Sequence, residues 1–132
     1  MSIEFQSSPS PNHNERKHPL NMLVLHYTGM KDGPSALARM QDPETEVSAH
    51  YMVEEGGVTH LLVPETERAW HAGRGSWQGD DDINSRSIGI EIVNGGHDFG
   101  LPEFPDAQIC AVIELCQEIL GRCSAGRSRP SW

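Results

Sequence analysis

The sequence predicts a single α/β (α+β) domain in which helices pack on a β-sheet. Residues 21–27 form a short, continuous apolar run, as expected for a strand buried on both faces. Residues 87–94 place Ile88, Ile90 and Ile92 on one face of a second strand, and residues 105–121 repeat apolar side chains at helical spacing. The length of 132 residues suits one domain, which buries about two-thirds of the surface of its unfolded chain.

The other elements follow from turn residues and apolar spacing. Pro34 suits the first position of a helix, and Gly56-Gly57 suits a hairpin turn between two strands. The polar composition before Leu20 predicts a loose arm. The full set is an N-terminal arm at residues 1–19, one or two helical turns at 34–40, hairpin strands at 48–54 and 58–63, and a long loop at 72–86.

The charge balance excludes some classes of partner. Ten basic and 19 acidic residues give a net charge of −9 and a pI near 5.1. A nucleic-acid binder needs a basic face that displaces counterions, and a peripheral membrane protein needs a polybasic patch. No apolar run approaches the roughly 20 residues of a membrane-spanning helix. We therefore expect neither nucleic acid nor a membrane as a partner.

The cysteines and the first residues bear on location. Cys110, Cys116 and Cys123 are odd in number and lack a paired spacing, which fits a reducing compartment better than a disulfide framework. Residues 1–19 contain no apolar segment like that of a secretory leader. These two observations predict a cytoplasmic location.

Glu91 is the residue that most strongly suggests chemistry. It lies in the middle of an apolar strand, where burial would raise its pKa toward the range useful for general acid–base catalysis. The alternatives are that Glu91 faces solvent on a half-exposed sheet, or that it pairs with Arg68 or Arg86.

Histidines provide further candidates. His26 ends the first predicted strand, and polar groups at the carboxyl ends of strands often form sites in α/β sheets. A neutral imidazole there suits zinc, although a histidine that is simply hydrogen-bonded in the core fits the same position. His50 and His71 are also candidates, but no pair of histidines has the spacing of a known metal motif.

Other catalytic patterns are absent from the sequence. It contains neither a G-x-S-x-G nucleophile elbow nor a P-loop. The acidic run at residues 80–82 lacks the ligand spacing of an EF-hand, so a solvated loop is expected there.

Several segments, in order, resemble the zinc-dependent N-acetylmuramoyl-L-alanine amidases, the superfamily that includes the peptidoglycan recognition proteins. The resemblance covers about residues 20–121. The matching segments are Met-Leu-Val-Leu-His-Tyr-Thr-Gly at 22–29, Val-Ser-Ala-His-Tyr-Met-Val at 47–53, Arg-Ala-Trp-His-Ala-Gly at 68–73, Asn-Ser-Arg-Ser-Ile-Gly-Ile-Glu-Ile-Val-Asn at 84–94, and Phe-Pro-Asp-Ala-Gln at 104–108.

The resemblance implies a mixed central β-sheet flanked by helices, and a zinc-bound water in a groove. It assigns His26 to the metal and makes Glu91 the general base that then protonates the leaving amine. It places Trp70, His71 and Asn94 along the substrate groove. The implied reaction cleaves the amide between N-acetylmuramic acid and L-alanine, so the implied partners are peptidoglycan fragments (muropeptides).

The C-terminal part departs from the family pattern. The family's other two zinc ligands follow the last long helix, whereas this chain has no histidine after His97. Residues 122–132 hold three arginines and no acid, so we expect a non-family basic tail, produced by truncation or a reading-frame change, after an amidase-like domain at 20–121. Substitute ligands would have to come from Cys123, His97 or Asp98. The sequence therefore leaves an inactive muropeptide-binding module, or a non-functional fragment, as alternatives to an enzyme.

Overall fold

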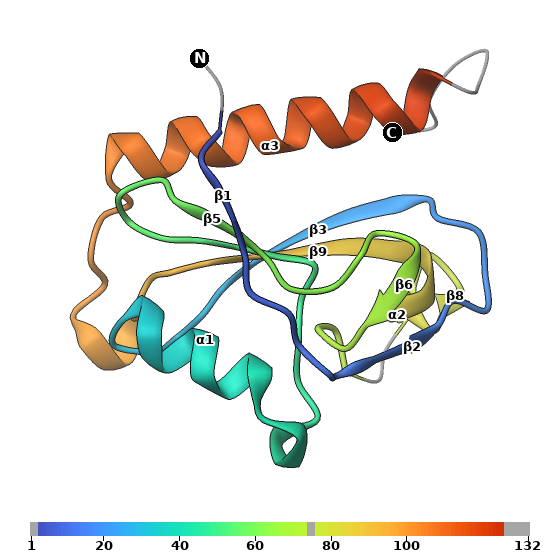
Figure 1. Ribbon diagram of the computed structural model, residues 1–132, viewed down its shortest axis with the longest axis horizontal. Helices are drawn as coiled ribbons and strands as arrows, with labels where there is room; N and C mark the ends of the chain where they lie inside the picture. Colours follow the sequence, from blue (N-terminus) through green and yellow to red (C-terminus); the bar gives the residue numbers. More distant parts are fainter. Residues whose placement is uncertain (1–2, 74–75, 126–132) are drawn as a thin grey trace.

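A computed structural model describes residues 3–73 and 76–125 of the chain. Its centre is a five-stranded sheet in which β4 and β5 are antiparallel and the other neighbours are parallel (Figure 1). The strands, in spatial order, are β1 (Phe5–Ser7), β5 (Thr59–Leu61), β4 (Tyr51–Val53), β9 (Ser87–Ile92) and β3 (Met22–Tyr27). The predicted α/β class with a mixed central sheet is confirmed.

Helices cover the two faces of this sheet (Figure 1). Helix α3 (Asp106–Ala125) packs an apolar stripe, including Leu115 and Ile119, against the face that carries Ile88 and Ile90. Helix α1 (Gly33–Gln41) packs on the opposite face, where it joins a second apolar cluster of Ala36, Met40, Ala49, Met52, Leu62, Val63, Ala69 and Val93. The sheet thus has an α3 face and an α1 face, each with its own core.

Local signals explain where the two helices begin. The Asp32 side chain accepts a hydrogen bond of 2.9 Å from the backbone N–H of Ser35, and Pro34 occupies the first turn of α1. Asp106 lies in the first turn of α3, where a carboxylate complements the helix dipole. Gln108 then fixes α3 to the sheet, because its Nε2 donates to the carbonyls of Val53 and Val93 at 3.0 and 2.9 Å.

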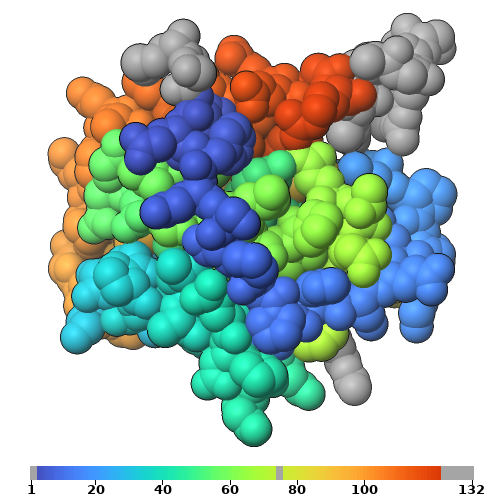
Figure 2. All heavy atoms as spheres, viewed as in Figure 1, coloured from blue at the N-terminus to red at the C-terminus, as the bar shows by residue number. Residues whose placement is uncertain are grey.

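The N-terminal segment is part of the fold, so the prediction of a loose arm was wrong. β1 pairs with β5, and β2 (His13–Glu15) pairs antiparallel with β6 (Glu67–Ala69). Arg16 donates to the backbone carbonyls of Glu65, Ser85 and Ser87 at 2.8–3.0 Å. Figure 2 shows the N-terminal residues, in dark blue, lying against the rest of the molecule on the side that faces the viewer. The segment is held by backbone carbonyls distant in sequence, which its polar composition does not reveal.

Two other segments also differ from the predictions. The expected loop at 72–86 contains a short hairpin, β7 (Ser76–Trp77) with β8 (Asp80–Asp81), and helix α2 (Ile83–Arg86). β3 is an edge strand, not one buried on both faces, and Leu25 and Tyr27 are 50% and 55% exposed. A continuous apolar run does not distinguish a central strand from an edge strand.

The remaining elements are two short 3₁₀ helices, η1 (Pro43–Thr45) and η2 (Gly96–Phe99). Helix α3 runs to Ala125, past its predicted end at Gly121, and residues 126–132 of the expected basic tail lie outside the described part. Within the described part, no helix has the length and apolar character needed to cross a membrane.

Candidate active site

The site is built on the last residues of two parallel strands. β3 and β9 pair in a register that sets His26 directly opposite Glu91, and β4 sets Met52 opposite Glu91 on the other side. Side chains of directly opposite residues share a face of a sheet. Since Met52 belongs to the cluster on the α1 face, His26 and Glu91 also lie on that face. The strand register therefore brings together the two residues that the sequence assigned to chemistry.

Glu91 has the properties of a poised acid–base group. Its Oε2 is buried and has no hydrogen-bond partner among the described residues. Burial raises the pKa of Glu91 to about 7, while the positive charge of Arg39 acts in the opposite direction. The carboxyl group can therefore both accept and donate a proton near neutral pH.

The structural alternatives for Glu91 do not hold. Arg68 is paired with Asp82 at 2.9 Å, and Arg86 lies 3.8–3.9 Å from the carboxylates of Asp80 and Asp81. Neither arginine is thus the partner of Glu91, and the glutamate is too deeply placed for a side chain that simply faces solvent.

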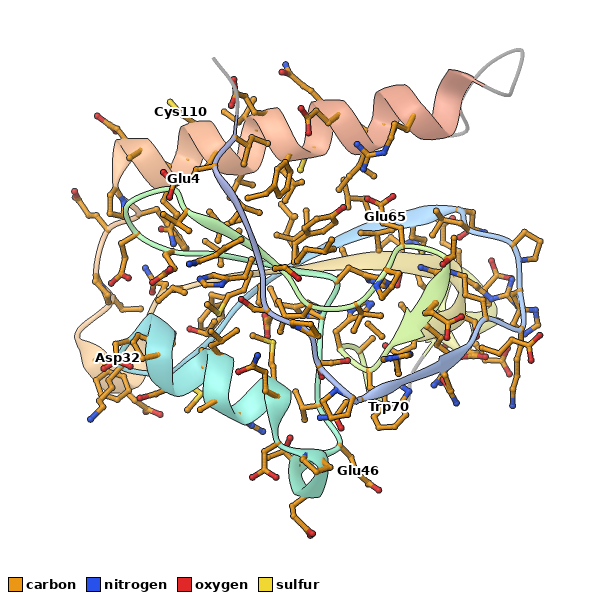
Figure 3. All side chains as sticks on the ribbon, viewed as in Figure 1. Glu4, Asp32, Glu46, Glu65, Trp70 and Cys110 are labelled. Carbon is orange, nitrogen blue, oxygen red and sulfur yellow. The ribbon has the colours of Figure 1, made fainter. Side chains whose placement is uncertain are left out.

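Glu91 opens into a cleft of about 610 Å³. Trp70 forms part of its wall, held by a 3.0 Å hydrogen bond from its Nε1 to Oδ1 of Asn14. Figure 3 shows Trp70 and Glu46 on the α1 side of the central sheet. The cleft is lined by Asn14, Arg39, Glu46, Val47, Arg68, Trp70, His71, Gly73, Asn84 and Glu91. It offers a polar groove beside a buried carboxyl group.

His71 lies at the cleft, but its ring is engaged on both sides. Its Nδ1 is 2.9 Å from Nε2 of His26, and its Nε2 is 2.9 Å from Oγ of Ser87. The ring covers Gly89, where a Cβ would come within 2.5 Å of it. Burial, followed by the nearby charges of His26 and His50, lowers the pKa of His71 to about 3, so the ring is neutral.

His50 is buried beneath this pair and makes structural hydrogen bonds. Its Nδ1 accepts from the N–H of Gly89 at 3.0 Å, so its Nε2 carries the proton and donates to the carbonyl of Glu67 at 2.9 Å. Burial lowers the pKa of His50 to about 4. Both ring nitrogens are used within the fold.

Asn94 braces a loop next to the site. Its Nδ2 donates to the carbonyl of Pro102 at 2.8 Å, and its Oδ1 accepts from the N–H of Gly96 at 2.9 Å. Asn94 does not line the cleft described above. Its contact with substrate stays a prediction.

A catalytic zinc ion in a protein has three protein ligands and an open position. No group of three or more His, Cys, Asp or Glu residues is placed to hold a metal ion within residues 3–73 and 76–125. The His26 and His71 nitrogens, 2.9 Å apart, share a hydrogen bond, whereas two nitrogens on one tetrahedral zinc lie about 3.3 Å apart. The described residues do not fit a catalytic zinc.

The substitute ligands considered from the sequence do not complete the site. His97 and Asp98 belong to η2, and the Cys123 side chain is not among those described.

Some residues of this site were missed by reasoning from the sequence. Arg39 and Glu46 line the cleft from α1 and the segment after it, and no local pattern marks them. Ser87 and Asn84 support His71: the N–H groups of His71 and Ala72 donate to Oδ1 of Asn84 at 3.0 and 2.9 Å. Both lie in the 84–94 segment that carried the resemblance, which was a usable signal.

Known proteins show the same fold and sequence pattern. The family model described as N-acetylmuramoyl-L-alanine amidase matches residues 16–129, a wider range than the expected domain at 20–121. AmiD, an N-acetylmuramoyl-L-alanine amidase of Escherichia coli, is 39% identical over 115 residues, which is 78% of this chain and 41% of AmiD. AmpD, a 1,6-anhydro-N-acetylmuramyl-L-alanine amidase of Haemophilus influenzae, is 28% identical over 130 residues, 84% of this chain and 68% of AmpD.

Solved structures of amidases have the same fold as this chain. A crystal structure of an AmpD derivative matches it with a TM-score of 0.77 at 30% identity, and the match covers 92% of this chain and 76% of the AmpD chain. E. coli AmiD in complex with anhydro-N-acetylmuramic acid-L-Ala-D-γ-Glu-L-Lys has a TM-score of 0.69 at 35% identity, over 87% of this chain and 46% of its own. This chain thus spans about two fifths of AmiD and two thirds of AmpD. From the family match, these similarities and the Glu91 site, we conclude that the chain belongs to the N-acetylmuramoyl-L-alanine amidase family.

Proposed function

We propose that this chain hydrolyses the amide bond between N-acetylmuramic acid and L-alanine in peptidoglycan fragments. The observation that carries the proposal is Glu91, a buried carboxyl group with a pKa of about 7 and an unpartnered oxygen at a polar cleft. The ligand of the AmiD complex, anhydro-N-acetylmuramic acid-L-Ala-D-γ-Glu-L-Lys, is the substrate to test first.

Glu91 supplies the proton transfers that amide hydrolysis needs. In its ionised form it accepts a proton from a water molecule as the water oxygen bonds to the amide carbon. As the carbon–nitrogen bond breaks, Glu91 returns that proton to the departing nitrogen, so the products are a carboxylic acid and an amine. A pKa of about 7 suits both transfers, because the two protonation states are nearly equal in energy at neutral pH.

Zinc dependence is general in this family, and the resemblance assigns His26 to the metal. The described residues do not supply the other two ligands, so no step is assigned to the metal here. We propose that His26 acts next to Glu91, its register partner, although His26 is not among the residues that line the cleft.

The sequence leaves open a second function, a muropeptide-binding module without hydrolysis, which the named relatives, all amidases, do not favour. The cleft is present, but no three-ligand metal group exists within the described residues. Such a module would bind the same ligand through Trp70 and the cleft walls and leave its amide bond intact.

One experiment separates the two functions. The purified chain is incubated with anhydro-N-acetylmuramic acid-L-Ala-D-γ-Glu-L-Lys, with and without added zinc, and the released peptide is quantified by mass spectrometry. Calorimetry measures binding of the same ligand, and elemental analysis measures zinc. The amidase predicts peptide release that falls by about 10²–10⁴-fold in Glu91→Gln. Binding without release supports the module, and release that is equal in both proteins contradicts the role of Glu91.

A further inference from the structure

The hydrogen bonds around His71 define where its protons lie. The Ser87 Oγ is 2.7 Å from the carbonyl oxygen of Ile83, and a carbonyl can only accept. Ser87 has a single hydroxyl proton, which is therefore donated to Ile83. The Ser87 oxygen must then accept from His71 Nε2, 2.9 Å away, so this nitrogen carries a proton.

The same reasoning extends to His26. The hydrogen-bond partners of the His71 ring are Ser87 and His26, and neither is a carboxylate that would stabilise a second proton, so with its proton on Nε2 the ring has an unprotonated Nδ1. This Nδ1 lies 2.9 Å from Nε2 of His26 and can only accept a hydrogen bond from it. The Nε2 of His26 must therefore carry a proton, which leaves Nδ1 as the nitrogen of His26 with a free lone pair.

The backbone holds this chain of hydrogen bonds in place. Two N–H groups of the segment that carries His71 donate to Oδ1 of Asn84, which is 5% exposed. The ring lies against Gly89, where any side chain would collide with it. The His26 and His71 rings meet edge to face, with centroids 5.1 Å apart. His71 is thus fixed at its backbone, at its ring face and at both ring nitrogens.

We propose that His71 is a positioning residue, which together with Ser87 holds His26 in the Nε2–H tautomer and so leaves Nδ1 as the unprotonated nitrogen of His26, the register partner of Glu91. This differs from the sequence-based prediction that His71 contacts substrate. The link to turnover rests on the proposed amidase function, whereas the tautomer does not depend on it.

The tautomer is measured by NMR on the full chain with ¹⁵N-labelled histidine. In the wild-type protein, His26 should show a protonated Nε2 and a bare Nδ1. His71→Leu removes the acceptor and should shift His26 toward a mixture of tautomers. His71→Asn places a carboxamide oxygen close to the position of Nδ1 and should restore the wild-type signal. Ser87→Ala should disturb both rings.

A second serine–histidine pair in the chain provides the matched control. Ser8 Oγ lies 2.8 Å from Nδ1 of His60, which is bonded to Glu54 on its other side. Ser8→Ala should therefore change the His60 signals and leave those of His26 unchanged.

Kinetics test the functional half of the proposal. With the muropeptide as substrate, kcat should fall about tenfold or more in His71→Leu, with little change in KM, and should recover in part in His71→Asn.

Three outcomes would contradict the proposal. An unprotonated Nε2 on His26 in the wild-type spectrum, a measurement that needs no variant to fold, would overturn it. So would a His26 tautomer unchanged in both His71→Leu and Ser87→Ala, or a KM effect without a kcat effect. If the wild-type chain releases no peptide, the amidase proposal fails, while the spectrum still decides the tautomer.

Discussion

His26 and Glu91 are register partners on the parallel strands β3 and β9, although 65 positions separate them in the chain. Their neighbourhood combines a carboxyl group of raised pKa with an imidazole whose pKa is lowered by burial. Both shifts disfavour charge, so the two side chains lie side by side in their neutral forms around pH 7 more readily than they would in water. This pairing is the basis of the predictions for Glu91.

Replacing Glu91 by Gln should stabilise the protein more at pH 8 than at pH 5. The folded pKa of Glu91, about 7, exceeds its unfolded value of 4.5, so the folded state binds more protons and loses stability as pH rises between these values. The variant avoids this loss, so the difference in free energy of unfolding between the variant and the wild-type protein should favour the variant by about 2–3 kcal/mol more at pH 8 than at pH 5. Urea unfolding at the two pH values measures it. The exposed Glu103→Gln is the control, and an equal pH effect in both variants would contradict the assignment.

Gly89→Ala should destabilise the fold and displace His71. A Cβ at this position would lie 2.5 Å from the His71 ring, which is held at both nitrogens and cannot move aside without losing a hydrogen bond. We expect a loss of about 1–3 kcal/mol in the free energy of unfolding. Gly56→Ala is the matched control, because nothing lies within 4 Å of its Cβ position. Similar unfolding midpoints for the two variants would contradict this prediction.

Gln108→Ala should weaken the attachment of α3 to the sheet. The side chain is fully buried, and its loss removes the donor that Gln108 gives to the carbonyl of Val93, whereas the carbonyl of Val53 still accepts from the N–H of Val93. We expect a cost of about 1–3 kcal/mol, since a buried carbonyl that loses its donor is expensive. Gln117→Ala, on an exposed face of the same helix, should cost less than about 0.5 kcal/mol by denaturant titration. A small cost at Gln108 would show that the bridge contributes little.

Arg16→Lys should be costly despite conserving charge. The Arg16 guanidinium donates to the carbonyls of Glu65, Ser85 and Ser87 through three different nitrogens, which a single ammonium group cannot reproduce. The free energy of unfolding should fall by about 2–4 kcal/mol. The exposed neighbour Lys17→Ala is the control, and calorimetric melting of both variants gives the comparison. Equal melting temperatures would mean that the N-terminal segment is not held through Arg16.

The sequence singled out the two residues that the structure places opposite each other, His26 and Glu91, but it did not reveal the strands of the N-terminal segment. Glu91 and His26 could be found because a charged or polar residue stands out in an apolar strand, and the local motifs around them are distinctive. The pairing of β1 with β5, and of β2 with β6, could not be found, because these strands are three residues long and too short for a periodic pattern. The edge position of β3 was missed because the composition of a strand does not specify its neighbours. The cytoplasmic location stays a prediction.

The strand order has a consequence for how fast the chain folds. Within the central sheet, only β4 and β5 are joined by a short turn; β1 meets β5, and β3 meets β9, across more than 50 residues of intervening chain. Closing such long loops lowers the entropy of the chain before any strand contact compensates for it. Folding should therefore begin at the β4–β5 hairpin and proceed slowly for a domain of this size. His26 and Glu91 come together only when the parallel strands β3 and β9 pair, so the arrangement of these two side chains should form late in folding.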